Sequence, residues 1–126
     1  MAIRIGLTHT CERTTRPEES AAALGSGGLE VFSTPSLVAL FELTAKQLAD
    51  PLLPLGDSTV GSEIQVKHLK ATPIGMKVRC TVTVTAVEGR RIRFAGEMWD
   101  ERGRIGEGSH TRYQVNDAEF LRRLDG

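Results

Sequence analysis

Three polar residues stand in elements whose other positions follow an apolar pattern. Thr34 and Glu42 bracket the start of a predicted helix, and His68 lies on a strand further along the chain. A hydroxyl, a carboxylate and an imidazole are the groups from which acyl-transfer sites are built. The triplet therefore favours a hydrolytic site as the leading hypothesis.

His68 carries the clearest signal of the three. The alternation of its strand places it on one face with Ile64 and Val66, while the other face takes Glu63, Gln65 and Lys67. A neutral imidazole buried on an apolar face needs a partner for each ring nitrogen. A catalytic histidine and a satisfied structural histidine both fit this placement. His9 and His110 lie in less regular patterns, and we interpret both as ordinary structural or surface histidines.

Thr34 and Glu42 each have a simpler explanation beside the chemical one. A threonine hydroxyl can cap free helix amides and proline is preferred at the first helical position, so capping alone would explain Thr34 before Pro35. Glu42 falls at the edge of the apolar stripe, beside Val38 and Ala45, where it points either to solvent or to the boundary between helix and sheet. A carboxylate at that boundary could act as base or nucleophile.

A long helix and a curved sheet are the elements that must position these groups. The helix is predicted from Thr34 to about Asp50, because one face carries residues at i, i+3, i+4 and i+7 spacing, namely Leu37, Leu40, Phe41, Thr44 and Leu48. Period-two alternation predicts strands over 4–15, 60–68, 76–86, 92–98 and 105–115. Asn116 with Glu119 resembles the capping box of a short last helix. With no helical crossover, the last four strands can pair as an antiparallel meander, which gives an α+β fold.

Composition sets the protein class. The 126 residues are predicted to form a single domain, 1–126, and 40% hydrophobic with 25% charged residues is typical of a soluble globular protein. Sixteen basic and sixteen acidic residues cancel, which argues against nucleic acid as a partner. The first residues show no signal peptide and no apolar run of membrane-spanning length, so we expect a cytoplasmic protein that does not insert into membranes. A disulfide between Cys11 and Cys80 is not expected.

Metal and cofactor sites find no support in the sequence. No His or Cys pair has ligand spacing, and no phosphate loop follows a strand, so we expect no metal and no cofactor. Gly106 and Gly108 lie two apart in the last strand, which leaves that face bare enough for another backbone or a ligand to approach closely. A local basic stretch, 67–93, could attract a small anionic ligand.

Several segments in order resemble the fluoroacetyl-CoA thioesterase-like branch of the hotdog superfamily. They run from Val31 to Glu42, from Gly61 to His68 and from Ala71 to Gly75, followed by Val87-Glu88-Gly89-Arg90-Arg91 and by the stretch from Ile105 to Arg112. The resemblance covers roughly Arg4 to Val115. Any one segment is a weak match, but the set at matching spacing is fairly specific.

The resemblance implies a hotdog fold, a long helix wrapped by an antiparallel sheet, in a homodimer that binds acyl-CoA at the subunit interface. The family's catalytic threonine, glutamate and histidine match Thr34, Glu42 and His68, and its substrate-binding glycine and arginine match Gly61 and Arg112. In the implied reaction, Glu42 activates water or attacks the thioester carbonyl. His68 positions the substrate or transfers a proton, and Thr34 hydrogen-bonds Glu42 or the carbonyl oxygen.

One departure from the family bears on the substrate. Fluoroacetyl-specific members carry phenylalanines in the lid before the helix, where this chain has Gly25 and Gly28. We therefore expect a small or medium acyl-CoA in place of fluoroacetyl-CoA. Two other functions remain open: a hotdog protein that binds acyl-CoA without cleaving it, and a hydratase-type enzyme, although the Asp and His pairing of hydratases is missing around His68.

Overall fold

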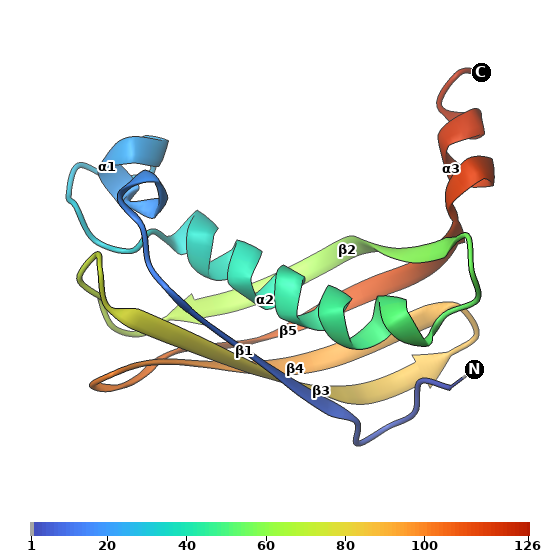
Figure 1. The fold of residues 1–126 in the computed structure, drawn as a ribbon, viewed down its shortest axis with the longest axis horizontal. Coiled ribbons are helices and arrows are strands. Elements are labelled where there is room, and N and C mark those ends of the chain that lie inside the picture. Colours follow the sequence, from blue (N-terminus) through green and yellow to red (C-terminus); the bar gives the residue numbers. More distant parts are fainter. Residues whose placement is uncertain (1) are drawn as a thin grey trace.

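The structure is a computed structural model that describes residues 2–126. One long helix lies across a five-stranded sheet, and a short helix stands at the C-terminal end of the chain (Figure 1). In chain order the elements are β1 (Thr8–Thr14), the 3₁₀ turn η1 (Pro17–Glu19), α1 (Ala21–Leu24), α2 (Thr34–Ala49), the 3₁₀ turn η2 (Asp50–Leu52), β2 (Asp57–His68), β3 (Lys77–Glu88), β4 (Arg91–Asp100), β5 (Gly103–Asn116) and α3 (Asp117–Arg123).

Helix α2 begins one position earlier than capping by Thr34 would require. Ser33 has extended backbone and its hydroxyl accepts a hydrogen bond from the Ser36 amide at 3.2 Å, so Ser33 is the N-cap and Thr34 is the first helical residue. The prediction that Thr34 caps the helix is therefore wrong. Because Ser33 caps the helix, the Thr34 hydroxyl is left available for another partner.

All strand pairs are antiparallel, and the strand order is β1-β3-β4-β5-β2. Strands β3, β4 and β5 form the predicted meander, but β2 pairs with β5 and not with its sequence neighbour β3. Alternation determines which face a side chain takes and does not select the neighbouring strand. Beyond β2, the Leu69 amide still bonds to the Ile105 carbonyl, and segment 69–76 then carries the chain across to β3.

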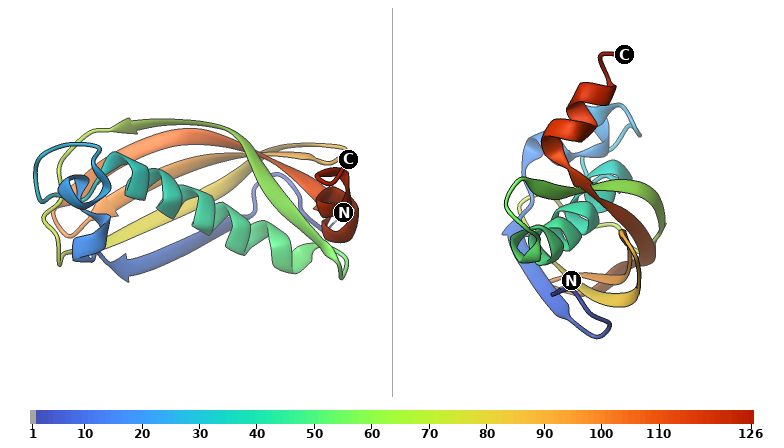
Figure 2. Two further views of the ribbon diagram at one scale, coloured as in Figure 1. Left: turned by 90° about the horizontal axis from the view of Figure 1, so that it is seen from above. Right: turned by 90° about the vertical axis from the view of Figure 1, so that its right-hand side faces the viewer.

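The sheet curves around α2, so the helix lies in the concave side of the sheet (Figure 2). The buried residues of α2 are those of the predicted stripe together with three small ones: Ser36, Leu37, Leu40, Phe41, Thr44, Ala45, Leu48 and Ala49. Two glycines permit the close contact. A β-carbon at Gly96 would come within 2.6 Å of the Phe41 ring, and one at Gly106 within 3.0 Å of Leu37. The helix therefore packs against bare backbone at these two points.

The first strand differs in detail from expectation. Strand β1 is shorter than predicted and leaves Ile5 68% exposed, because Gly6 turns the chain with a φ of +96°. Cys11 and Cys80 lie opposite each other on β1 and β3 as free thiols. Burial raises the pKa of the Cys80 thiol to about 11, which keeps it protonated and unreactive.

Within 2–126, every helix is too short or too polar to cross a bilayer.

Gly108 is the glycine whose replacement the sheet tolerates least. A β-carbon there would lie 2.0 Å from the main-chain oxygen of Gln65, so Gly108→Ala must push β2 away from β5. We expect a loss of about 1–3 kcal/mol in the free energy of unfolding, measured by urea denaturation. Gly28→Ala is the matched control, because a β-carbon at Gly28 has nothing within 4 Å. Equal denaturation midpoints for the two variants would contradict this assignment.

Candidate functional site

A direct hydrogen bond joins two of the three residues that the sequence singled out. Thr34 is the first residue of α2 and His68 the last residue of β2, and Thr34 Oγ1 lies 2.7 Å from His68 Nδ1. The alternation of β2 explains the contact, since His68 shares the helix-facing side of the strand with Ile64 and Val66. Thr34 therefore bonds His68, and it does not bond Glu42 as the resemblance allowed.

The other nitrogen of His68 is unpaired among the described residues. Nε2 is buried and has no hydrogen-bond partner among residues 2–126. Burial lowers the pKa of His68, and the nearby backbone of Lys70 opposes this shift without forming a well-aligned hydrogen bond to Nε2. The imidazole is thus mainly neutral at pH 7, with one nitrogen fixed by Thr34 and the other buried without a hydrogen-bond partner.

Glu42 lies elsewhere, beside Gly61 and Arg112. A β-carbon placed on Gly61 would be 2.9 Å from Glu42 Oε2 and 3.5 Å from Arg112 Nη1, so both groups lie against the bare α-carbon of Gly61. Glu42 is half-buried at the boundary between α2 and β2, as one of its two sequence interpretations proposed. The structure thus brings Glu42, Gly61 and Arg112 together, next to the point where β2 shifts register against β5.

Arg112 is held in place by neighbours that the sequence analysis did not select. Its Nε donates to Thr59 Oγ1 at 2.7 Å, its Nη2 donates to the Thr59 carbonyl at 2.9 Å, and its Nη1 lies 3.0 Å from His110 Nε2. Asp50 accepts from Thr59 Oγ1 at 2.6 Å. Burial lowers the pKa of the Arg112 guanidinium, while Asp50 and Glu42 favour its charged form.

One available signal would have identified part of this network. Gly106, Gly108, His110 and Arg112 alternate along β5, so His110 must share the helix-facing side with the predicted substrate-binding arginine. His110 is 1% exposed. Asp50 and Thr59 had no such signal, because a helix end and the start of a strand meet only in three dimensions.

The predicted residues form two groups that lie apart in one chain. Thr34 and Glu42 are eight residues apart on the same helix, a distance of about 12 Å along its axis. The first group combines an imidazole with a hydroxyl, and the second combines a carboxylate with a guanidinium. A thioester carbonyl in contact with one group lies too far from the other to contact both within one subunit.

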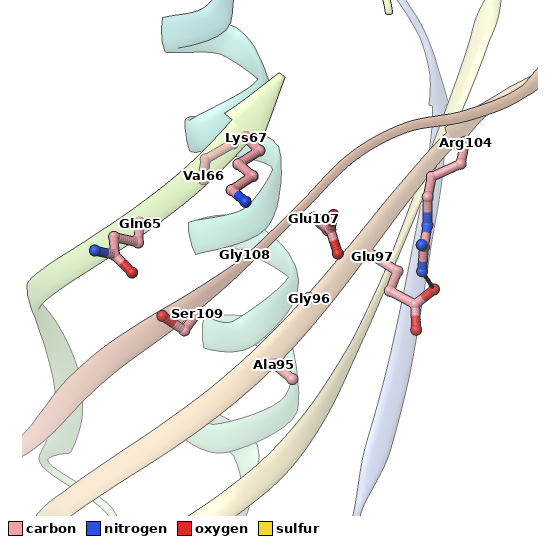
Figure 3. A pocket seen from close by; sticks show the side chains of 10 residues that line it. All are labelled: Gln65, Val66, Lys67, Ala95, Gly96, Glu97, Arg104, Glu107, Gly108 and Ser109. Atoms are coloured by element: carbon pink, nitrogen blue, oxygen red, sulfur yellow. Dashed lines mark hydrogen bonds and ion pairs between the residues drawn. The ribbon is translucent and has the colours of Figure 1, made fainter. Parts of the chain in front are cut away.

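Two hollows on the surface have room for a ligand. A hollow of about 250 Å³ opens at the first group and is lined by Val31, Phe32, Thr34, His68, Leu69, Lys70 and Ala71. A larger hollow of about 630 Å³ lies on the outer face of the sheet and contains the Arg104–Glu97 ion pair (Figure 3). Gln65 and Lys67 line the larger hollow, and they point away from His68 because strand residues alternate between faces. The smaller hollow is therefore the candidate site.

Comparisons with known proteins identify relatives of this chain. A family model described as fluoroacetyl-CoA-specific thioesterase matches residues 16–118. A fluoroacetyl-CoA thioesterase from Streptantibioticus cattleyicolor is 35% identical over 91 residues, which make up 72% of this chain and 66% of that protein. This aligned stretch is thus slightly less than two-thirds of the relative's length.

Solved structures extend the similarity to nearly the whole chain. A fluoroacetyl-CoA thioesterase structure superposes with a TM-score of 0.93 at 28% identity, covering 99% of this chain and 97% of that one. A mutant of the fluoroacetyl-CoA-specific thioesterase, solved with fluoroacetate and CoA, gives a TM-score of 0.89 at 30% identity, covering 94% and 99%. With its long helix wrapped by a five-stranded antiparallel sheet, the chain belongs to the fluoroacetyl-CoA-specific thioesterase family, a group of hydrolases with the hotdog fold.

Proposed function

We propose that this protein hydrolyses the thioester of a small or medium acyl-CoA to the free acid and CoA. The observation that carries the proposal is the Thr34–His68 hydrogen bond, which orients a neutral imidazole with a free Nε2 at the edge of a hollow. A solved relative that holds fluoroacetate and CoA adds support for the ligand class. Thr34, Glu42 and His68 are the proposed catalytic residues, with Gly61 and Arg112 at the substrate.

Each residue has a role that its surroundings favour. Thr34 donates to His68 Nδ1, so that Nε2 carries the proton and donates a hydrogen bond to the thioester carbonyl oxygen, where negative charge develops. The Glu42 carboxylate supplies the attack, either by taking a proton from water or by bonding to the carbonyl carbon itself. In the first case water adds to the carbonyl carbon, the carbon–sulfur bond breaks, and the CoA sulfur leaves with a proton taken from water. In the second case CoA thiolate leaves an acyl–Glu42 anhydride, which water then hydrolyses to the free acid and the regenerated carboxylate, and the thiolate takes up the proton released from that water.

The residues before α2 favour a substrate other than fluoroacetyl-CoA. Gly25 and Gly28 are exposed and place no side chain over the hollow, whereas fluoroacetyl-specific relatives are expected to have phenylalanines there. A hollow of about 250 Å³ has room for an acyl group of a few carbons. The basic residue at its edge is Lys70, which is positioned to meet a phosphate of CoA.

A homodimer would bring the two groups of residues together. Strand β2 is an edge of the sheet, and its outer backbone can pair with the same strand of a second copy. Helix α3 projects beyond β2 (Figure 1) and exposes three apolar side chains that such a partner could cover, namely Phe120, Leu121 and Leu124. In this arrangement one subunit supplies Thr34 and His68, and the other supplies Glu42.

Binding without cleavage is the alternative function, and the separation of Thr34 from Glu42 is the observation that favours it. A chain that remains monomeric would hold an acyl-CoA at His68 with no carboxylate near the carbonyl. Saturable binding of acyl-CoA with no release of free thiol over hours would support this alternative.

The first expectation concerns the rate of thiol release from a panel of acyl-CoAs. Glu42→Gln and His68→Ala each remove a group with a proposed chemical role, so we expect kcat/KM to fall by on the order of 10²-fold or more. Thermal unfolding of each variant serves as the control for folding. Rates equal to the wild-type rate in both variants would exclude these residues from catalysis.

The second expectation tests whether two subunits share one site. When the inactive Glu42→Gln and His68→Ala chains are unfolded, mixed equally and refolded, half of the dimers contain both variants and one of their two sites is intact. We expect recovery of about a quarter of the wild-type rate. Mixing Glu42→Gln with the double variant Glu42→Gln/His68→Ala is the control and should recover nothing. Absence of recovery in the first mixture would place each site within one subunit.

The third expectation tests whether Glu42 bonds covalently to the acyl group. In a single turnover with ¹⁸O-labelled water, label enters the Glu42 carboxylate only when an acyl-enzyme is hydrolysed by attack at the Glu42 carbonyl carbon, whereas a general base, or attack of water at the acyl carbon of an acyl-enzyme, puts label in the acid product alone. We expect no label in Glu42, since the half-buried carboxylate is accessible to water and can act as a base. Label in Glu42 would establish the covalent role. Mass spectrometry of the peptide that contains Glu42 gives the result directly.

A further inference from the structure

The Arg112 guanidinium lies beside Glu42 without pairing with it. Its Nη1 and the Glu42 Oε2 both touch the space above the Gly61 α-carbon, yet its three hydrogen bonds go to Thr59 and His110. A free guanidinium fork next to a carboxylate would form a bidentate pair, which is the strongest hydrogen-bonded arrangement available to both groups. The observed geometry therefore needs a restraint that keeps the two apart.

His110 supplies one side of that restraint, and its tautomer follows from its partners. Nδ1 lies 2.8 Å from the Glu63 carbonyl oxygen, which only accepts, so Nδ1 carries the proton and donates it. Nε2 then has a lone pair and accepts from Arg112 Nη1 at 3.0 Å. Burial lowers the pKa of His110, which keeps this acceptor unprotonated at pH 7. The ring is further fixed by Phe41, whose centroid lies 5.5 Å away.

Thr59 and Asp50 supply the other side of the restraint on Arg112. Thr59 accepts from Arg112 Nε and Nη2 through its hydroxyl and its carbonyl, and its own amide and hydroxyl donate to Asp50 Oδ1 at 3.1 and 2.6 Å. The negative charge of Asp50 thus balances Arg112 through one intervening residue, and Lys46 on α2 pairs with the other oxygen of Asp50. A guanidinium has five N–H groups, so two remain after these three bonds.

We propose that His110 is a positioning residue, acting with Thr59 and Asp50, that holds Arg112 away from Glu42 and presents a remaining N–H of Arg112 to the substrate. Glu42 thereby stays free to act on water or on the thioester, while Arg112 still contributes its charge to the site. The proposal rests on the proposed thioesterase function, in which Glu42 performs the attack.

Two variants separate the hydrogen bond between His110 and Arg112 from the hydrogen bond between His110 and Glu63. In His110→Asn the amide occupies the place of Nδ1, so it keeps the bond to Glu63 and loses the bond to Arg112. In His110→Gln the amide oxygen occupies the place of Nε2, so it keeps the acceptor for Arg112. Both variants bury one amide, which makes them matched for polarity.

The kinetic result expected is a split between the two variants. For an acyl-CoA that the wild type cleaves, His110→Asn should lower kcat by on the order of tenfold or more with little change in KM, and His110→Gln should restore most of the rate. A purely structural role would lower the melting temperature and the rate of both variants together. Equal kcat for His110→Asn and wild type would overturn the proposal.

A structural result tests the inference independently of turnover. In a crystal structure of His110→Asn, Arg112 should move its Nη1 to within hydrogen-bond distance of the Glu42 carboxylate, and in His110→Gln it should stay on residue 110. His110→Ala also removes the acceptor for Nη1 and should give the same movement if His110→Asn fails to fold. An unmoved Arg112 in the folded variants contradicts the restraint. A wild type that cleaves no acyl-CoA would contradict the proposed function alone.

Discussion

The close approach of α2 to the sheet is the constraint on which the rest of the structure depends. Phe41 and Leu37 rest on the bare backbone of Gly96 and Gly106, where a methyl group would come within about 3 Å of them. Close packing of this kind fixes both the height and the rotation of a helix, because interiors leave little room for adjustment. The rotation then determines that Glu42, the residue after Phe41, lies at the boundary with β2.

The same packing explains why the polar groups occur where they do. A buried guanidinium costs several kcal/mol unless its charge and its donors are satisfied. At the far end of α2 this requirement is met by Asp50, which ends the helix, and by Thr59 and His110 on the flanking strands. At the near end only Thr34 satisfies His68, and one ring nitrogen remains unpaired. Arg112 thus has three of its five N–H groups paired, while one ring nitrogen of His68 has no partner.

The sequence predicted which helices and strands form better than it predicted which strands pair with each other. The apolar spacing of α2 and the alternation of the strands follow from which face is buried, and both are read from local patterns. The pairing of β2 with β5 is a long-range choice that alternation does not encode, and it was missed. The cap at Ser33 was missed because two adjacent hydroxyl residues compete for one position, and backbone conformation decides between them.

The candidate site shows the same division between local and long-range information. Thr34, Glu42 and His68 were selected from their spacing and from a family resemblance, and Arg112 from the resemblance alone. His110 was interpreted as structural, although its alternation with Arg112 on β5 was visible in the sequence. The residues that restrain Arg112 become related only when η2, β2 and β5 meet, so no local pattern could have joined Asp50 to His110.

The free edge of β2 connects this arrangement to the proposed dimer. Gly61, which gives Glu42 its place, is exposed on that edge, and the hollow at His68 lies at the end of the same strand. A long unpaired edge is a liability for an isolated sheet, and proteins usually cover it. In the proposed dimer, a second copy on this edge would bring the carboxylate of one chain toward the imidazole of the other. One strand would then serve both stability and chemistry, which gives a physical reason for catalytic groups that lie about 12 Å apart on a single helix.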